Sequence, residues 1–217
     1  MFLHPPSQVE VKVTVFCASE SDDAETRKVM NFFLRLTPPA SVVLQLWELP
    51  MEQLLRRSIG RNLAARATRA DWVWLADCDM AFGEGALDAL QQELTPKDMI
   101  LAFPSQVLIH QTHAIGDAAI QRVLPGAGLL DVRSAEFVPK KYYRAIGGAQ
   151  IVLGEVIRKS GYCPQRRWQR PAERWYPTKE DIIFRRQLGT PGVAIDVPNV
   201  FRLRHSQCGR RCADLHL

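Results

Sequence analysis

The sequence predicts an α/β protein of one domain, with a mainly parallel central sheet flanked by helices. The first observation is a β-α-β-α-β succession of patterns between residues 11 and 76. The second is composition: the 217 residues are 47% hydrophobic and 24% charged, which suits one substantial core. The third is an apolar run, Trp72–Ala76, that ends at Asp77 and Asp79. Sites in parallel α/β sheets lie at the carboxyl ends of strands, so this run indicates where a site would lie.

The first half of the chain alternates between strand and helix signals. Val11–Ala18 is rich in β-branched residues and predicts a strand, and Ala24–Leu36 has the apolar spacing of a helix. Ser41–Leu46 predicts a second strand, which stops near a proline. Met51–Ala70 predicts one amphipathic helix, and the fully buried strand Trp72–Ala76 follows it. The apolar face of that helix consists of Leu54, Leu55, Ile59, Leu63 and Ala67.

The second half gives shorter signals. Ala86–Leu94 and Gln150–Lys159 predict helices, and Asp98–Phe103 predicts a strand. A helix that starts at Glu180 and a last strand, Val193–Val197, close the pattern. Residues 106–133 give no clear pattern, which in an enzyme is typical of a variable substrate region.

The pair Asp77 and Asp79 is the first candidate site. Residues i and i+2 of a strand lie on one side, so both carboxylates face the same point. Two close carboxylates repel each other unless a positive charge lies between them. Hard cations take oxygen ligands, so Mn²⁺ or Mg²⁺ suits this position. A lone D-x-D pair also occurs at ordinary polar strand ends, and the neighbouring motifs decide between the two interpretations.

Four segments follow one another in an order that resembles the family 2 glycosyltransferases of the GT-A fold. They are Arg61-Asn62-Leu63-Ala64, Asp77-Cys78-Asp79, Gly147-Gly148 and Glu180-Asp181. In that family an Arg-Asn-x-Ala helix precedes the D-x-D strand, a Gly-Gly segment lines the acceptor side, and a Glu-Asp pair carries the catalytic base. The resemblance spans roughly residues 11–211. It implies one GT-A domain: about 11–104 as a Rossmann-like nucleotide-sugar half, and about 105–217 as an acceptor half with a basic C-terminal tail.

The resemblance implies a hexosyltransferase that moves a sugar, with inversion, from a nucleotide-diphosphate sugar to a hydroxyl. A UDP-sugar is the favoured donor, and the acceptor is a carbohydrate or another hydroxyl compound. Asp181 is then the general base, and Glu180 positions the acceptor or exchanges roles with it. Asp79 holds the metal, Asp77 binds the metal or the ribose, and His205 is the third ligand. The remaining substrate-binding candidates are Arg61, Asn62, Gly147 and Gly148, with Arg202, Arg204, Arg210 and Arg211 for the diphosphate.

Two features depart from the family pattern. Family members usually have two strand-helix units before the strand that precedes the Arg-Asn helix, and this chain has one. At the end of the first strand the family often has an aspartate pair that holds the nucleotide base, where this chain has Cys17 and Ala18. A catalytically silent relative that only binds ligands is therefore an alternative.

The charge leaves two further alternatives. The net charge of +5 permits an anionic partner, either a nucleotide diphosphate or a nucleic acid. Nucleic-acid binding would not explain the carboxylates of Asp77, Asp79 and the Glu180-Asp181 pair, so no nucleic acid is expected. A nucleotidyltransferase usually has a glycine-rich basic loop after its first strand, whereas residues 18–23 are acidic here.

Apolar runs, the first residues and the cysteines indicate the compartment in which the protein is expected. The sequence has no apolar run near the roughly 20 residues that cross a bilayer, and its first residues do not resemble a secretory signal. Five cysteines, an odd number, indicate reduced thiols. We therefore expect a cytoplasmic protein without a transmembrane segment, with peripheral membrane association as an open alternative.

Overall fold

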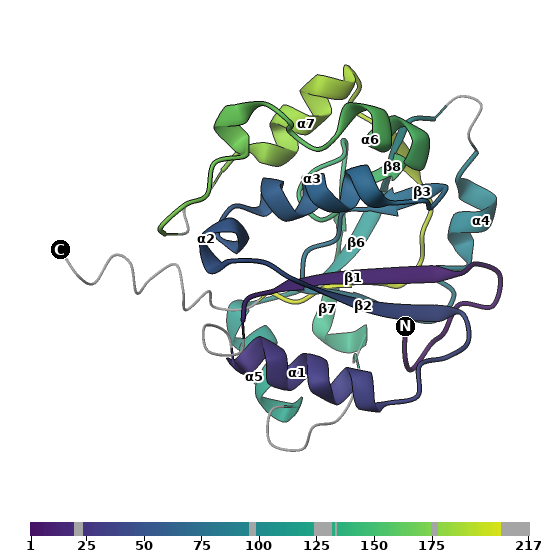
Figure 1. Cartoon of the computed structure of the whole chain (residues 1–217). Helices are drawn as coiled ribbons and strands as arrows, with labels where there is room; N and C mark the ends of the chain where they lie inside the picture. The colour runs from purple at the N-terminus through teal and green to yellow at the C-terminus, as the bar shows by residue number, and fades with distance from the viewer. Residues whose placement is uncertain (20–23, 96–98, 124–131, 133, 175–177, 205–217) are drawn as a thin grey trace.

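Helices surround small mixed sheets in the computed structural model (Figure 1). The structure describes residues 1–19, 24–95, 99–123, 132, 134–174 and 178–204. Within them the predicted α/β class is confirmed. The expected single, mainly parallel sheet is not what the described strands form: they divide into one parallel pair and two mixed four-stranded sheets.

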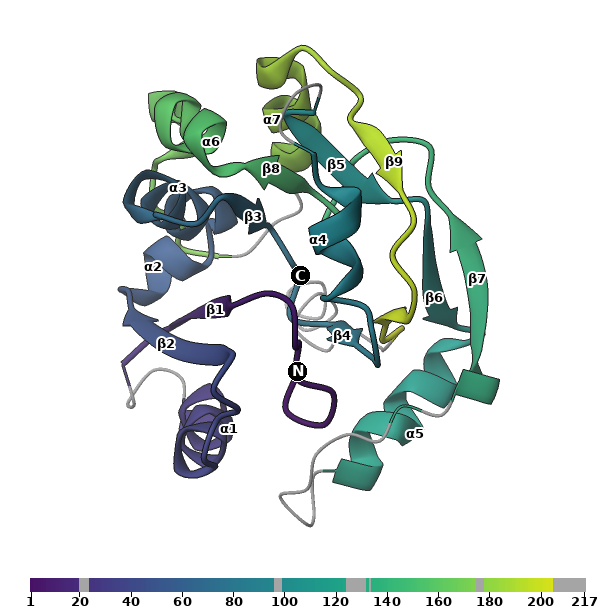
Figure 2. The same cartoon turned by 90° about the vertical axis from the view of Figure 1, so that its right-hand side faces the viewer.

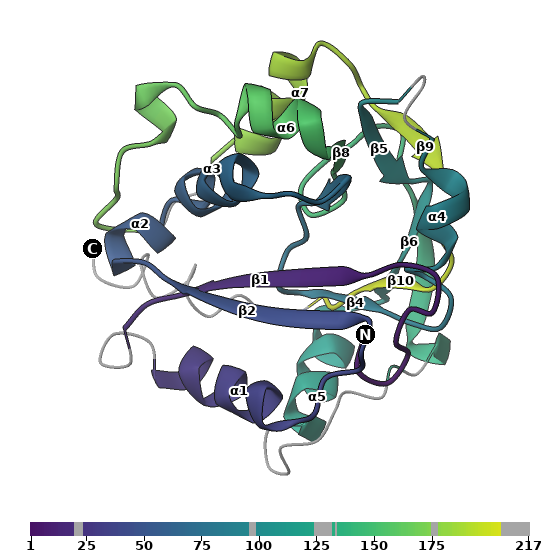
Figure 3. The ribbon, with the colours of Figure 1, turned by 45° about the vertical axis from the view of Figure 1, so that its right-hand side comes forward.

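The parallel pair consists of β1 (Val11–Cys17) and β2 (Val42–Glu48), connected by α1 (Ala24–Arg35). All three elements were predicted, because β-branched runs and a helical apolar stripe are unambiguous over this length. Figures 1 and 3 show α1 on one side of the pair and the helices of residues 51–67 on the other. The pair is thus a layer between helices, as in a βαβ unit.

The predicted single helix Met51–Ala70 is two helices, α2 (Met51–Leu54) and α3 (Arg57–Ala67). Arg56 lies between them with φ −120° and ψ 90°, an extended conformation that ends the helical hydrogen bonding. Arg56 is buried, although its position in one continuous helix predicted an exposed side chain. The break therefore gives α3 an orientation of its own, and this orientation decides which side chains of α3 meet the site.

A mixed sheet has the strand order β3-β8-β5-β9, and Figure 2 shows it beneath α3, α6 and α7. β8 runs antiparallel to both of its neighbours. It occupies the first part of the helix predicted for Gln150–Lys159, because a short apolar run is compatible with either a strand or a buried helix. The elements are β3 (Trp72–Trp74), β5 (Leu101–Pro104), β8 (Ile151–Leu153), β9 (Val193–Ile195), α6 (Gly154–Ser160) and α7 (Glu180–Leu188).

The other mixed sheet has the order β4-β10-β6-β7, and its strands were not predicted. Each strand has five residues or fewer, and partners such as β4 and β10 are far apart in the sequence. The elements are β4 (Met80–Phe82), β6 (Gln106–His110), β7 (Phe137–Lys141) and β10 (Val200–Arg202), with α4 (Ala89–Glu93) and α5 (His113–Val123) beside them. Two 3₁₀ turns, Ser134–Glu136 and Arg166–Trp168, complete the described elements.

The core lies between the β3-β8-β5-β9 sheet and the helices that cover it. Leu101 and Ile151 of the sheet are about 1% exposed, and Ile157 of α6 and Phe184 of α7 are fully buried against the same cluster. Burying such side chains contributes about 1.5–3 kcal/mol each. The two covering helices end at Gly161 and Gly189, both at positive φ, the conformation for which glycine is favoured after a helix.

Residues 75–79 form the turn between β3 and β4, and they carry the chain from one mixed sheet to the other. The turn is fixed on both sides: Leu75 N–H donates to Gln150 O over 2.8 Å, and Leu203 N–H donates to Asp79 O over 2.7 Å. Asp77 and Asp79 therefore lie where the two sheets meet. Among the described residues no helix has both the length and the apolar character needed to cross a bilayer.

Candidate active site

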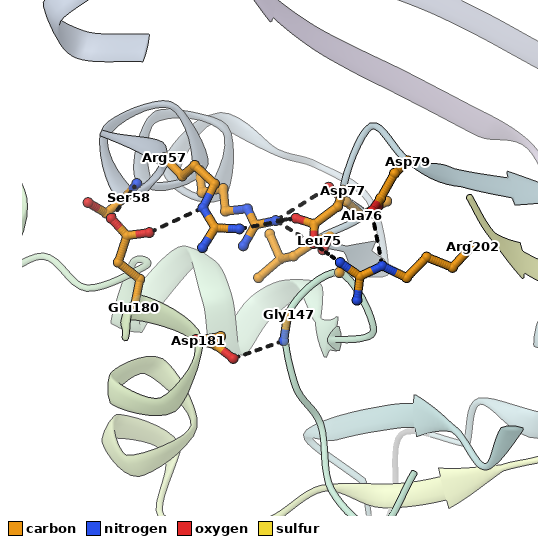
Figure 4. Close-up of polar contacts among 12 residues, drawn as sticks. Arg57, Ser58, Leu75, Ala76, Asp77, Asp79, Gly147, Glu180, Asp181 and Arg202 are labelled. Atoms are coloured by element: carbon orange, nitrogen blue, oxygen red, sulfur yellow. Dashed lines mark hydrogen bonds and ion pairs between the residues drawn. The ribbon is translucent and has the colours of Figure 1, made fainter. Parts of the chain in front are cut away.

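Asp77 and Asp79 face a common partner, as predicted, but that partner is a side chain (Figure 4). Arg202 Nε donates to Asp79 Oδ2 over 3.0 Å, and its Nη2 lies 3.8 Å from Asp77 Oδ2. β3 ends at Trp74, so the two carboxylates converge through the turn after the strand and not through strand alternation. The guanidinium of Arg202 thereby supplies the positive charge that two adjacent carboxylates require.

The first two turns of α3 supply two more guanidiniums to Asp77. Arg61 Nη2 donates to Asp77 Oδ1 over 2.8 Å, and Arg57 Nη1 donates to the same oxygen over 3.3 Å. The two arginines are four residues apart and therefore share one face of the helix. Arg61 is buried, and its Nη1 also donates to the Tyr162 hydroxyl over 3.2 Å. These contacts hold the Asp77 carboxylate in one orientation.

Glu180 connects the same arginine face to α7. Its side chain is only 1% exposed, and its Oε2 lies 3.5 Å from Arg57 Nε. Its Oε1 accepts a hydrogen bond from Ser58 N–H over 3.3 Å. Figure 4 shows Arg57 between Glu180 and Asp77, so one guanidinium joins the first turns of α3 and α7 to the β3–β4 turn. A buried carboxylate needs such a partner, because an unpaired buried charge is strongly unfavourable.

Asp181 lies beside the Gly147-Gly148 segment. Its Oδ2 accepts a hydrogen bond from Gly147 N–H over 3.0 Å, and its side chain is only partly buried. Gly147 has φ +51°, which a residue with a Cβ rarely adopts. A Cβ on Gly148 would lie 2.6 Å from the backbone nitrogen of Asp77. The glycine pair thus lets this segment approach Asp77 on one side and Asp181 on the other.

The charges of this cluster nearly cancel. Arg57, Arg61 and Arg202 face the carboxylates of Asp77, Asp79 and Glu180, and Asp181 lies at the edge of the group. Desolvation acts to lower the pKa of Arg202, but the charge of Asp79 and the hydrogen bond to it outweigh desolvation, so the pKa of Arg202 is raised. The guanidinium of Arg202 therefore stays charged opposite Asp79.

The aspartates have the donor chemistry of a divalent-cation site. Asp79 Oδ1 is buried and accepts no hydrogen bond from the described residues. A buried carboxylate oxygen without a donor is a suitable ligand for a hard cation. The part of the chain that the structure describes contains no group of three or more His, Cys, Asp or Glu side chains placed to hold a metal. A complete shell would therefore need ligands from elsewhere, and the predicted third ligand, His205, lies outside the described residues.

Two predicted substrate-binding residues lie away from the carboxylates. Asn62 Oδ1 accepts from Tyr162 N–H over 3.0 Å, and its Nδ2 donates to Gln169 Oε1 over 3.3 Å, so it joins α3 to the segment after α6. Arg204 Nε donates to His113 Nε2 over 3.3 Å, and its Nη1 donates to Gln111 O. Arg204 therefore holds the β6–α5 segment and is not part of the cluster. Arg210 and Arg211, like His205, lie outside the described residues.

Arg57 is the functional candidate that sequence reasoning missed. Arg57 is not among the residues of the apolar face of the predicted helix Met51–Ala70, and an arginine outside such a face is ordinarily exposed. Its position four residues before Arg61 was the available signal, because i and i+4 share a helix face. Arg202 was predicted as a diphosphate ligand, and its contact with both aspartates was not foreseen.

At the end of β1, Cys17 and Ala18 offer no exposed side chain that could hold a nucleotide base. Cys17 and Ala18 are fully buried there. Ala18 O accepts a hydrogen bond from Arg27 Nε over 3.2 Å, and Arg27 also forms an ion pair with Glu48.

No protein-family model matches this chain, and no curated protein does either.

Proposed function

We propose that this chain is a metal-dependent, inverting glycosyltransferase of the hexosyl type. The donor is a nucleotide-diphosphate sugar, with a UDP-sugar favoured, and the acceptor is a hydroxyl of a carbohydrate or another compound. One observation carries the proposal: the four segments of the sequence resemblance, separated by up to 120 residues, converge. Arg61 contacts Asp77, Gly148 abuts Asp77, and Gly147 contacts Asp181. A GT-A arrangement of the whole domain is part of this proposal.

The aspartates and Arg202 would serve the leaving group. Departure of the sugar leaves negative charge on the terminal phosphate of the nucleotide. Mn²⁺ or Mg²⁺, held by Asp79 together with Asp77, would supply a Lewis acid that stabilises this charge. The side chains of Arg202 and Arg57 are each 38% exposed, so both guanidiniums can also reach a phosphate from solvent. Arg61 is buried and positions Asp77.

The environments of the two adjacent carboxylates support Asp181 as the base. Glu180 is buried, and its two carboxylate oxygens contact Arg57 and Ser58 N–H, so neither oxygen is open to an acceptor. Asp181 is partly exposed, and its Oδ2 accepts the Gly147 N–H. A base must reach the acceptor hydroxyl within hydrogen-bond distance. We therefore assign proton removal to Asp181 and the positioning of the cluster to Glu180.

A catalytically silent relative is the second candidate, and two observations favour it. Arg202 contacts both aspartates, which gives them a cation without a metal. The buried Cys17 and Ala18 offer no side chain to the nucleotide base. Such a protein would bind a ligand without transferring a sugar.

Thermal unfolding with UDP, GDP and CDP, each with and without Mn²⁺, tests the donor half. A ligand at 100 times its dissociation constant stabilises the folded state by about 2.7 kcal/mol. For a chain of this size that corresponds to a rise in Tm of about 5–11 °C. We expect the rise with one nucleotide, only with Mn²⁺, and its loss in Asp79→Ala. Glu84→Ala removes an exposed carboxylate nearby and should retain it. The proposal fails if no nucleotide stabilises the protein.

Asp181→Asn separates the transferase from the silent relative. The amide keeps the acceptor oxygen for Gly147 N–H but cannot take a proton. We expect transfer to fall by about 10²–10⁴-fold, with the Mn²⁺-dependent nucleotide stabilisation retained. Donor turnover by wild type that is unchanged in Asp181→Asn would contradict this assignment. Nucleotide binding without turnover in wild type would establish the silent relative.

A further inference from the structure

The segment after β7 presents a basic surface with an exposed aromatic side chain at its centre. We define the 140–146 surface as Lys140, Lys141, Tyr143, Arg144 and Ile146. Tyr143 is 86% exposed, the highest value among the large exposed hydrophobic side chains of the described residues. Lys140, Lys141 and Arg144 are also exposed. A single exposed hydrophobic side chain is ordinary, so what distinguishes this surface is the exposed ring together with three exposed basic side chains.

The backbone holds this surface in place. Tyr142 N–H donates to Ser105 O over 2.8 Å, and Ala145 N–H donates to Pro191 O over 2.9 Å. Arg185 Nη1 donates to Ala145 O over 2.7 Å. Tyr142 and Ala145 are buried, so the residues between them are directed outward. β7 is the edge strand of its sheet, which leaves this side of the molecule uncovered by other described strands (Figure 2).

The charge of the surface has one sign. Lys140, Lys141 and Arg144 form no ion pair with the described residues. The β6 residues that pair with Lys140 and Lys141 are Val107 and Gln106, and both are uncharged. α7 adds two more arginines, Arg185 and Arg186, since Arg185 interacts electrostatically with both Arg144 and Arg186. Asp181, whose Oδ2 accepts the Gly147 N–H, is a carboxylate that acts on Arg185. Unneutralised basic side chains around a tyrosine are complementary to an anionic surface.

The geometry points to an anionic lipid bilayer as the partner of the 140–146 surface. Lysine and arginine bind the headgroups of anionic lipids, and tyrosine places its ring at the level of the headgroups with its hydroxyl in water. A hollow of about 490 Å³ lies between these side chains and offers room for a headgroup. It is lined by Lys140, Lys141, Tyr142, Tyr143, Arg144, Ile146 and Pro191.

The position of this surface indicates which substrate would come from the bilayer. Arg144 is three residues from Gly147, whose N–H holds the proposed base Asp181. A bilayer on the 140–146 surface would therefore adjoin the acceptor side of the candidate site. In the proposed transferase the acceptor hydroxyl is then carried by a lipid; this step depends on the proposed function, whereas bilayer binding does not.

Co-sedimentation with vesicles tests the inference on the full chain without nucleotide. We expect binding to phosphatidylcholine vesicles that contain phosphatidylserine, weaker binding at higher salt, and little binding to phosphatidylcholine alone. Lys140→Glu/Lys141→Glu should lower the partition coefficient at least about 30-fold, and Tyr143→Ala about tenfold. The control Lys12→Glu/Lys28→Glu changes the charge equally at two exposed lysines elsewhere and should bind as wild type.

The outcomes are distinct from those of the nucleotide experiment. Tm values of the variants within a few degrees of wild type establish that the fold is intact. The inference is overturned if the wild-type protein does not bind anionic vesicles. It is also overturned if wild type and Lys140→Glu/Lys141→Glu bind them equally. Duplex DNA bound through the same lysines, without vesicle binding, would assign the surface to nucleic acid. Failure of nucleotide binding alone leaves the lipid result unchanged.

Discussion

Replacing Arg61 with methionine removes the central contact of the cluster and leaves the aliphatic part of the side chain. The variant loses the 2.8 Å hydrogen bond to Asp77, and it leaves the buried Tyr162 hydroxyl without its guanidinium donor. A charge-assisted hydrogen bond contributes about 1.5–3 kcal/mol, and an unsatisfied buried group costs about 1–3 kcal/mol. Breaking a buried ion pair costs about 3–5 kcal/mol.

The lower end of that range applies to Arg61→Met, because Asp77 keeps two other cations. Arg57 lies 3.3 Å from Oδ1 of Asp77, and Arg202 lies 3.8 Å from Oδ2. We expect the free energy of unfolding to fall by about 3 kcal/mol, and Tm to fall by about 6–12 °C for a chain of this length. Arg69→Met is the matched control: Arg69 follows the same helix and is exposed, so its replacement should change stability by less than about 0.5 kcal/mol.

Urea unfolding of a double-mutant cycle measures the pair itself. Arg61→Met, Asp77→Asn and their combination should give a coupling energy of about 1–3 kcal/mol, with unchanged m values. If Arg61→Met is as stable as Arg69→Met, Arg61 does not anchor Asp77 and the assigned role is wrong. A coupling energy near zero with a large single effect would instead attribute the loss to Tyr162.

Two further predictions concern the glycine pair and a buried thiol. Gly148→Ala places a Cβ 2.6 Å from Asp77 N, so it should abolish the Mn²⁺-dependent nucleotide stabilisation. Gly85→Ala meets no atom within 4 Å and is strained only by its φ of +73°, far from the contact with Asp77 N, so it should retain this stabilisation; equal behaviour of the two variants would contradict the close approach. Burial, followed by the charge of Glu180, raises the pKa of the Cys163 thiol from 9.0 to about 12. Between pH 9 and pH 12 the thiol ionises mainly in the unfolded protein, which lowers the free energy of unfolding. The contribution of this thiol to stability is therefore fully present below pH 9 and falls above it. Denaturation at pH 9 and at pH 10.5 gives the fall in the free energy of unfolding between the two pH values. We expect this fall to be about 1.5 kcal/mol smaller for Cys163→Ala than for wild type, and equal falls would disprove the raised pKa of Cys163.

The longer elements were predictable because their patterns admit one interpretation. The β-branched run of β1, the apolar stripe of α1 and the acidic first turn of α7 were all identified. The break at Arg56 was not, because no Gly or Pro marks it and the apolar spacing continues through it. The apolar run of β8 predicts the start of a helix, because three apolar residues become a strand only when β3 and β5 supply its hydrogen bonds.

The carboxylates of the candidate site were predictable, and their partners were less so. Asp77 and Asp79 were named from their motif and spacing, and the resemblance to family 2 glycosyltransferases added Glu180, Asp181 and Arg61. The pairing of arginines with carboxylates depends on the orientation of α3 and on the strand with which β10 pairs. Both are set by the tertiary structure and not by the local sequence. Arg202 and Arg204 illustrate this: they are two residues apart, yet one contacts the aspartates and the other contacts His113.

The shared guanidinium of Arg57 has a thermodynamic consequence. It lies between Asp77, on the side assigned to the donor, and Glu180, next to the residue assigned to the acceptor. A ligand that draws Asp77 away from Arg57 strengthens the hold of Arg57 on Glu180, so occupancy at one side changes the free energy of binding at the other. Such coupling is reciprocal: the factor by which donor alters acceptor affinity equals the factor by which acceptor alters donor affinity. In a transferase such coupling makes the affinity for each substrate depend on the occupancy of the other site, and here it would pass through a single side chain.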